Sequence, residues 1–314
     1  MIKSKICDIL GIQYPIFPGG LAWIADAKLA AAVSNAGGLG IISSINFGTE
    51  AVRAEIRKCR ELTDKPFGVN IMLMAPNAAE VADMVIEEGV KILTTGAGSP
   101  SPYMEKWKAA GIKVIPVVAS VAYALKMQEL GATAVIAEGA ESGGHIGDIH
   151  TMALVPQIVD ALDIPVMAAG GIFDGRGAAA AFMLGACGVQ LGTRFLSAYE
   201  CGVHPNYKKK ILKATDLCTM VTGKRLGHPV RQLRTPFAKK YWEAEYGGMP
   251  DDELEALGTG VLRLAAVEGD EERGCFLSGQ IAAMVKKEQP AAEIIKELME
   301  EAEPLLLGAS KWVE

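Results

Sequence analysis

Hydrophobic positions follow two alternating patterns along the first two-thirds of the chain. Short runs rich in Val and Ile, apolar at nearly every position, alternate with longer segments whose apolar residues recur three and four positions apart. Continuous apolar runs are typical of parallel strands buried on both faces, and the longer spacing is typical of amphipathic helices. The runs predict eight strands, at residues 15–17, 39–43, 67–73, 92–95, 113–118, 134–137, 165–169 and 188–194.

Seven helices are predicted between these strands, at residues 26–35, 49–61, 77–88, 102–110, 120–130, 151–162 and 175–184. Several end on a glycine, a common helix stop, and three successive helix-to-strand junctions share one phrase, "EEGVKILTT", "AAGIKVIPV" and "ELGATAVIA". Strict alternation of strand and helix predicts a parallel sheet. Eight strands with seven linking helices favour a closed (β/α)8 TIM-type barrel over residues 1–196, and an eight-stranded doubly wound sheet is the alternative.

The pattern changes after about residue 197. Residues 199–234 are polar and mixed, and helical spacing returns at 251–257, 260–267, 277–287 and 291–305. We therefore expect a second, smaller, mostly helical domain over residues 197–299, covering the active site. The C-terminal helix, at about residues 300–314, is expected to pack back on the barrel.

Composition excludes several classes of protein. The formal net charge of −6 disfavours a nucleic-acid partner, because duplex-binding proteins present a basic face. The cluster Lys208–Lys210 is predicted to be a solvated helix face. The six cysteines form no Cys-x-x-Cys pair, so neither a zinc site nor a redox dithiol is indicated, and we interpret them as reduced thiols. No signal peptide is apparent and the longest apolar run, 178–189, is too short for a membrane span, so we expect a cytoplasmic protein.

Glycines and a hydroxyl follow the last two predicted strands. Gly170 and Gly171 end the seventh strand, and Gly192 and Thr193 end the eighth. The loops after these strands form the usual phosphate site of a barrel, because their backbone N–H groups face an anion. Glycine is also common at strand ends simply because the chain turns there. Two such ends together favour a ligand that carries phosphate.

Polar side chains interrupt two apolar strands near their carboxyl ends, where a barrel places its active site. Asn70 lies in the third strand and Glu138 ends the sixth. Burying such a group without a hydrogen bond costs roughly 2–7 kcal/mol, so each needs a partner. The partner is either an internal polar layer of the barrel or, as we favour, a polar cofactor.

A histidine follows the sixth strand in the phrase Ser142-Gly143-Gly144-His145. Its imidazole can donate or accept a proton near neutral pH, although a solvated histidine in a glycine-rich turn is the plain alternative. No group of residues has the spacing of metal ligands, and no Gly-x-Ser-x-Gly elbow is present. The sequence therefore predicts no metal site.

These loops resemble a known family. The segments "YPIFPGGLAW", "TDKPFGVNIML", "AVIAEGAESGGHIG", "PVMAAGGI" and "GVQLGTRF" are similar to the flavin-dependent enoyl-acyl-carrier-protein reductase II of bacterial fatty-acid synthesis and to the nitronate monooxygenases, once called 2-nitropropane dioxygenases. The resemblance implies an FMN. It would place Gly20, Leu21 and Asn70 at the ring, Glu138 at the ribityl hydroxyls, Ser142, Gly143 and Gly144 along the flavin, Gly170, Gly171, Gly192 and Thr193 at the phosphate, and His145 beside the substrate.

The same resemblance implies NAD(P)H-dependent reduction of trans-2-enoyl chains on acyl carrier protein, with NADH as the expected co-substrate, a homodimer, and a monovalent cation as an optional activator. An acidic carrier protein needs a basic dock. Candidates are Lys208–Lys210, Lys224, Arg225, Arg231 and Arg234, unless these are dispersed solubilising charges. Three other functions stay open: oxidation of alkyl nitronates by oxygen, a non-redox sugar-phosphate lyase or isomerase, and a non-catalytic binding protein.

Overall fold

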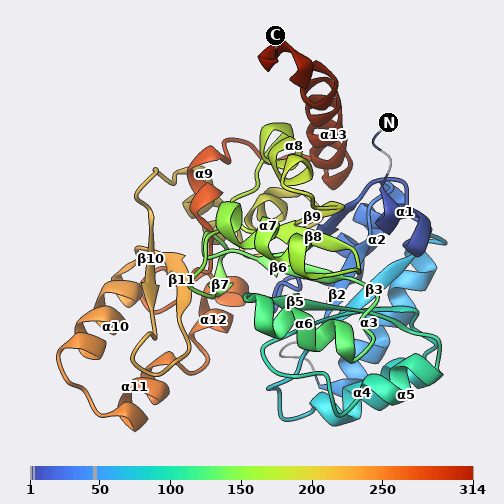
Figure 1. Cartoon of the computed structure of the whole chain (residues 1–314). Coiled ribbons are helices and arrows are strands. Elements are labelled where there is room, and N and C mark those ends of the chain that lie inside the picture. The colour runs from blue at the N-terminus through green and yellow to red at the C-terminus, as the bar shows by residue number, and fades with distance from the viewer. Residues whose placement is uncertain (1, 3, 45–47, 314) are drawn as a thin grey trace.

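Eight parallel strands form a barrel at the centre of the protein (Figure 1), in a computed structural model that describes residues 2, 4–44 and 48–313. The strands are β1 (Ile16–Pro18), β2 (Gly40–Ser43), β3 (Phe67–Met72), β4 (Ile92–Gly96), β5 (Lys113–Val118), β6 (Val135–Glu138), β8 (Val166–Ala169) and β9 (Gly188–Leu191). Their order is β1-β9-β8-β6-β5-β4-β3-β2. The N–H of Leu39 donates to the carbonyl of Ile16 at 3.0 Å, which joins the two ends of this sheet. The predicted barrel is confirmed, and the open doubly wound sheet is excluded.

Seven helices link the strands and cover the outside of the barrel: α2 (Ala27–Asn35), α3 (Thr49–Leu62), α4 (Ala78–Glu87), α5 (Met104–Ala109), α6 (Val121–Glu129), α7 (Thr151–Ala161) and α8 (Gly175–Met183). Side-chain caps fix where α2, α6 and α8 begin. Asp26 accepts from the N–H of Leu29 at 2.9 Å, and Asp174 does the same for the first turn of α8. Such caps satisfy amide groups that lack a partner inside the helix.

The barrel interior is a packed apolar core. Phe17, Ile41, Ile115, Ile136 and Met167 point inward from five strands, and each is fully buried. A short helix that the sequence analysis did not predict, α1 (Lys5–Leu10), adds Ile6 to this cluster. With the interior filled in this way, a ligand has room only where the strands end.

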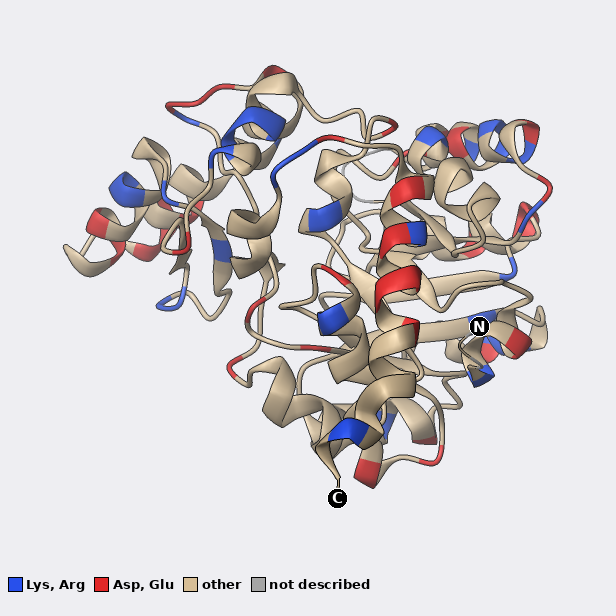
Figure 2. Ribbon diagram, turned by 90° about the horizontal axis from the view of Figure 1, so that it is seen from above, with Lys and Arg blue, Asp and Glu red and all other residues tan. Residues whose placement is uncertain are grey.

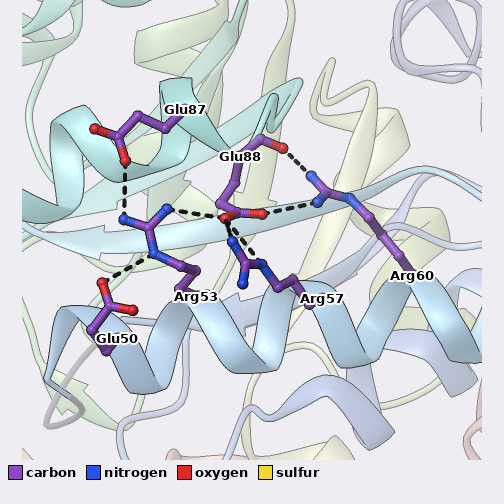
Figure 3. A network of polar contacts seen from close by, with 6 residues as sticks. All are labelled: Glu50, Arg53, Arg57, Arg60, Glu87 and Glu88. Carbon is purple, nitrogen blue, oxygen red and sulfur yellow. Dashed lines mark hydrogen bonds and ion pairs between the residues drawn. The ribbon is translucent and has the colours of Figure 1, made fainter.

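A group of charged side chains ties α3 to the end of α4 on the outside of the barrel (Figure 3). Glu88 accepts hydrogen bonds from Arg53, Arg57 and Arg60 of α3, although only 7% of its side chain is exposed. The hydrogen bond from Arg57, with those from the other two arginines, lowers the pKa of Glu88 to about 2. The carboxylate therefore stays ionised and holds the two helices together at neutral pH.

The rest of the chain forms an extension beside the barrel (Figure 1). It contains α9 (Pro205–Leu212), β10 (Thr219–Thr222), β11 (Val230–Leu233), α10 (Pro236–Tyr246), α11 (Asp251–Gly258) and α12 (Val261–Arg263). The long C-terminal helix, α13 (Ala291–Leu307), packs on α8 and α2 of the barrel. None of the helices in the described ranges combines the length and the apolar character needed to cross a bilayer.

Two features of this extension differ from the secondary structure that the sequence pattern predicts. β10 and β11 pair with β7 (Gly144–His145) in a three-stranded antiparallel sheet that was not predicted. The helix predicted over residues 277–287 is wrong: only a 3-10 turn, η3 (Gln280–Met284), forms there. The physical reason is that Leu277 pairs as a β-bridge with Gln232 and Gly279 binds the barrel, so this backbone is extended rather than coiled.

The eighth strand is also shorter than predicted. β9 ends at Leu191, and Thr193–Ser197 form a 3-10 helix, η1. Gly192 lies between the two elements, so the chain turns at the position where the sequence analysis expected a phosphate loop.

Candidate active site

A cavity of about 650 Å³ opens at the carboxyl ends of the barrel strands and is closed on one side by the extension. All twelve residues that the sequence analysis singled out line it: Gly20, Leu21, Asn70, Glu138, Ser142, Gly143, Gly144, His145, Gly170, Gly171, Gly192 and Thr193. The strand order places β6, β8, β9 and β1 side by side, which brings these loops together.

One end of the cavity is built from the loops after β8 and β9. Gly170 and Gly171 have φ values of 91° and 73°, in the region that glycine tolerates best. A side chain at position 170 would also place its Cβ 2.7 Å from the carbonyl oxygen of Gly139. Within the described residues, the backbone N–H groups of Gly171 and Gly192 donate none of the hydrogen bonds found outside helices and strands. These amides are available to an anion.

Glu141 lies beside this end and was not among the predicted site residues. Its carboxylate accepts from the N–H of Thr151 at 3.0 Å and from the Thr151 hydroxyl at 2.9 Å. Thr151 is the first residue of α7, where the helix dipole favours negative charge. The same hydroxyl contacts the carbonyl of Gly170 at 2.9 Å, so Glu141 holds the loop in shape rather than repelling an anion unopposed.

Glu138 ends β6 and turns its carboxyl group toward the cavity. Ser142 donates a hydrogen bond to it at 2.6 Å. Burial raises the pKa of Glu138 from 4.5 to about 7, and the serine hydroxyl opposes this rise only in part. A carboxyl group in this state suits a ligand that brings hydroxyl donors of its own.

Asn70 of β3 lies at the opposite side of the same opening. Its Nδ2 donates to the hydroxyl of Thr94 at 2.9 Å, which fixes the amide plane. A side chain at position 20 would place its Cβ only 2.2 Å from the Asn70 carboxamide carbon, so Gly20 is what allows the loop after β1 to pass so close. The amide and the glycine loop therefore form a single wall.

His145 is held by backbone pairing, and among the described residues its side chain makes no hydrogen bond. It lies in β7 opposite Val230 of β11, and its side chain is exposed to the open cavity. Surrounding protein nevertheless lowers its pKa by desolvation, and the nearby His228 lowers it further. The imidazole is therefore mainly neutral at pH 7 and can accept a proton or donate a hydrogen bond.

Other residues beside the cavity were not among the predicted site residues. Trp23 and Ala97 both have positive φ values, 64° and 49°, which are uncommon for residues with a side chain and tend to occur at functional sites. Gly279 donates its N–H to the hydroxyl of Thr193 at 2.8 Å, and Gln280 donates to the carbonyl of Glu141 at 2.9 Å. These bonds seat the extension on the barrel and close the cavity.

The cavity residues fit a flavin mononucleotide. The volume lies in the range of cofactor pockets, roughly 300–1,000 Å³. Free amides at Gly171 and Gly192 suit its phosphate, Glu138 suits its ribityl hydroxyls, and the fixed amide of Asn70 suits the polar edge of its ring. No cluster of three or more His, Cys, Asp or Glu side chains that could hold a metal occurs in the described part of the chain.

The basic residues proposed as a dock do not form one surface. Lys208 is buried and binds the carbonyl of Ala198 and the carboxylate of Glu288, which corrects its prediction as a solvated residue. Arg231 is also buried and donates to the carbonyl of Ala140 at 3.0 Å. Figure 2 shows basic and acidic positions interspersed over the ribbon. Two of the candidates thus serve packing, because each is buried and donates to one backbone carbonyl and one side-chain oxygen.

Comparison with known proteins gives consistent results. The family described as nitronate monooxygenase matches residues 3–301. The chain is 48% identical to FabK from Thermotoga maritima, with a TM-score of 0.97 and 100% of each chain covered. It is 27% identical to the nitroalkane oxidase of Streptomyces ansochromogenes, with a TM-score of 0.86 and coverage of 98% of this chain and 100% of the other.

Two of the curated relatives carry different names. A (3aS,4S,5R,7aS)-5-hydroxy-7a-methyl-1-oxo-octahydro-1H-indene-4-carboxyl-CoA dehydrogenase of Mycobacterium tuberculosis is 34% identical over 100% of this chain and 99% of its own length. A probable nitronate monooxygenase of Staphylococcus saprophyticus is 33% identical over 97% and 99%.

Proposed function

The chain belongs to the nitronate monooxygenase family of flavin-dependent oxidoreductases, and from that premise we propose that it is an FMN-dependent enoyl-acyl-carrier-protein reductase. The reaction would reduce a trans-2-enoyl thioester with NAD(P)H, and NADH is the co-substrate we expect. The observation that carries this choice is the 48% identity to FabK over the whole of both chains, since we infer that FabK represents the reductase II branch. The carboxyl-CoA relative is consistent with a thioester substrate.

When bound, the flavin would supply hydride to C3 of the enoyl chain, and the protein would bind, orient and exclude water. His145 would orient the thioester or deliver a proton to C2, since its imidazole faces the cavity. Glu138 would hold the ribityl hydroxyls while Ser142 keeps the carboxyl group in place. The bonds from Gly279 and Gln280 to the barrel would keep solvent out of this side of the cavity.

A test of the role of His145 separates the two half-reactions. In His145→Ala, reduction of enoyl thioester by the reduced protein should slow by a factor of roughly 10² if the imidazole transfers the proton. Bleaching of the flavin by NADH should not change. His228→Ala is the companion variant: His228 does not line the cavity and only lowers the pKa of His145, so its removal should change the rate far less. Unchanged thioester reduction in His145→Ala would remove the imidazole from the mechanism.

Oxidation of alkyl nitronates by oxygen is the second candidate. Curated relatives with that name support it, and so does the lowered pKa of His145, which makes the imidazole available as a base. One anaerobic experiment separates the two functions. Rapid loss of the yellow flavin colour on adding NADH supports the reductase, whereas loss with an alkyl nitronate but not with NADH supports the monooxygenase.

A further inference from the structure

Positive charge around the cavity is concentrated on one side chain. Among the cavity-lining residues that the structure describes, Arg263 is the only lysine or arginine. Glu138, Glu141 and His145 each have a place in the site, but the arginine is not used by the mechanism above. It lies in α12, in the extension, and half of its side chain is exposed.

Two contacts position Arg263. Its guanidinium carbon lies 5.9 Å from the ring centre of Trp23, a residue of the loop after β1. Its Nη1 forms an ion pair with Glu268, which is also exposed. In the described ranges its Nε and Nη2 donate no hydrogen bond, so two nitrogen atoms with three N–H groups remain free. The arginine therefore bridges barrel and extension and keeps donors for a ligand.

We propose that Arg263, steadied by the Trp23 ring, is an anion subsite that binds the phosphate groups of whichever substrate occupies the cavity. These are the pyrophosphate of NAD(P)H in one half-reaction and the phosphates of a coenzyme A or phosphopantetheine thioester in the other. The inference rests on the proposed function, in which the two substrates enter the same cavity in turn.

The chemistry of both substrates favours this place. Each is longer than a cavity of about 650 Å³ can hold beside a flavin, so its phosphates lie outside the reacting end. A guanidinium presents a planar set of donors that matches phosphate oxygens, and an aromatic face adds cation–π attraction. Glu268 competes only weakly, because exposed ion pairs gain little.

Equilibrium binding tests the subsite without turnover. The FMN-loaded protein is titrated calorimetrically with ADP-ribose, which has the pyrophosphate but no nicotinamide, and with coenzyme A, which has no acyl chain. Arg263→Ala should weaken both by roughly ten- to a hundredfold, the loss expected for charged hydrogen bonds. Arg263→Lys should fall between this variant and the wild type. Glu268→Gln should tighten binding by up to roughly fivefold, because a competing acceptor is removed.

The matched control is Arg273→Ala. This substitution removes the same charge from the same segment of the chain. The Arg273 side chain is 73% exposed and pairs with Asp270, and it does not line the cavity. Its removal should leave both affinities unchanged. Equal binding by wild type and Arg263→Ala, or no binding by the wild type, overturns the subsite. Dependence on Arg263 for only one ligand overturns its shared role.

Failure of the proposed function gives a different result. If binding depends on Arg263 but NADH with crotonyl-coenzyme A gives no turnover, the reductase assignment fails and the subsite stands. If turnover is observed and Arg263→Ala binds both probes normally, the subsite fails and the reductase assignment stands. The resident cofactor is the remaining source of phosphate. Loss of affinity for FMN but not for riboflavin in Arg263→Ala would assign the arginine to the flavin and overturn the proposal.

Discussion

Replacing Glu138 by glutamine tests the electrostatics of the candidate site. Burial raises the pKa of this carboxyl group from 4.5 to about 7. A group that ionises less readily in the folded protein stabilises the fold only while it is protonated. In flavin-free protein, this contribution is fully present below pH 4.5 and is lost as the pH rises through about 7.

The magnitude follows from the size of that rise in pKa. At about 1.4 kcal/mol for each pKa unit, the rise from 4.5 to about 7 corresponds to at most roughly 3–4 kcal/mol. Glu138 is only partly buried, so solvent in the cavity reduces the free-energy cost of ionising its carboxyl group. We therefore expect Glu138→Gln to gain about 1–3 kcal/mol of stability relative to wild type between pH 5 and pH 8.

Urea unfolding of flavin-free wild type and Glu138→Gln at several pH values measures this gap. Other titrating groups contribute equally to both proteins and cancel in the difference. A gap that does not widen as the pH rises would refute the reasoning. Flavin binding should change in the opposite direction, weakening by roughly tenfold, because an amide accepts hydroxyl hydrogen bonds less strongly than a carboxylate.

Three further substitutions test the cavity wall and the outer layer. Gly20→Ala should abolish flavin retention, because its Cβ would lie 2.2 Å from the Asn70 carboxamide carbon, whereas Gly308→Ala, in open space, should retain flavin. Gly143→Ala would place a Cβ 2.5 Å from the backbone of the segment that closes the cavity, so flavin affinity should fall in a fluorescence titration. Glu88→Gln should lower Tm by roughly 2–5 °C at pH 7. Because the pKa of Glu88 is lowered to about 2, that difference should be present above pH 4.5 and shrink as the pH falls toward 2.

Much of the barrel could be predicted because its signals are local. A strand buried on both faces must be apolar at consecutive positions, and helices must alternate with strands for the sheet to be parallel. Glycines such as Gly171 and Gly192 lie at strand ends, so knowledge of the fold class already places them together. The twelve predicted cavity residues converge for this reason, and their binding roles stay predictions.

The predictions that were wrong concern residues whose environment is set by segments distant in the sequence. Lys208 lies in a run of lysines typical of a protein surface. In the structure it is buried, and its ammonium group donates to the carbonyl of Ala198 and the carboxylate of Glu288. Leu277 belongs to a stretch with helical spacing, and its pairing with Gln232 overrides that tendency. Local periodicity cannot show such contacts, because tertiary packing outweighs small differences in helix propensity.

By itself, then, the sequence determined the barrel, the end of it that carries chemistry and the glycine loops gathered there, because each follows from a repeating pattern of burial. Only the tertiary structure decided what closes that end. The hydrogen bond from Gly279 to Thr193 and the contact of Arg263 with Trp23 join segments far apart in the chain. Such contacts depend on how the extension folds back over the barrel, and no periodic pattern records that.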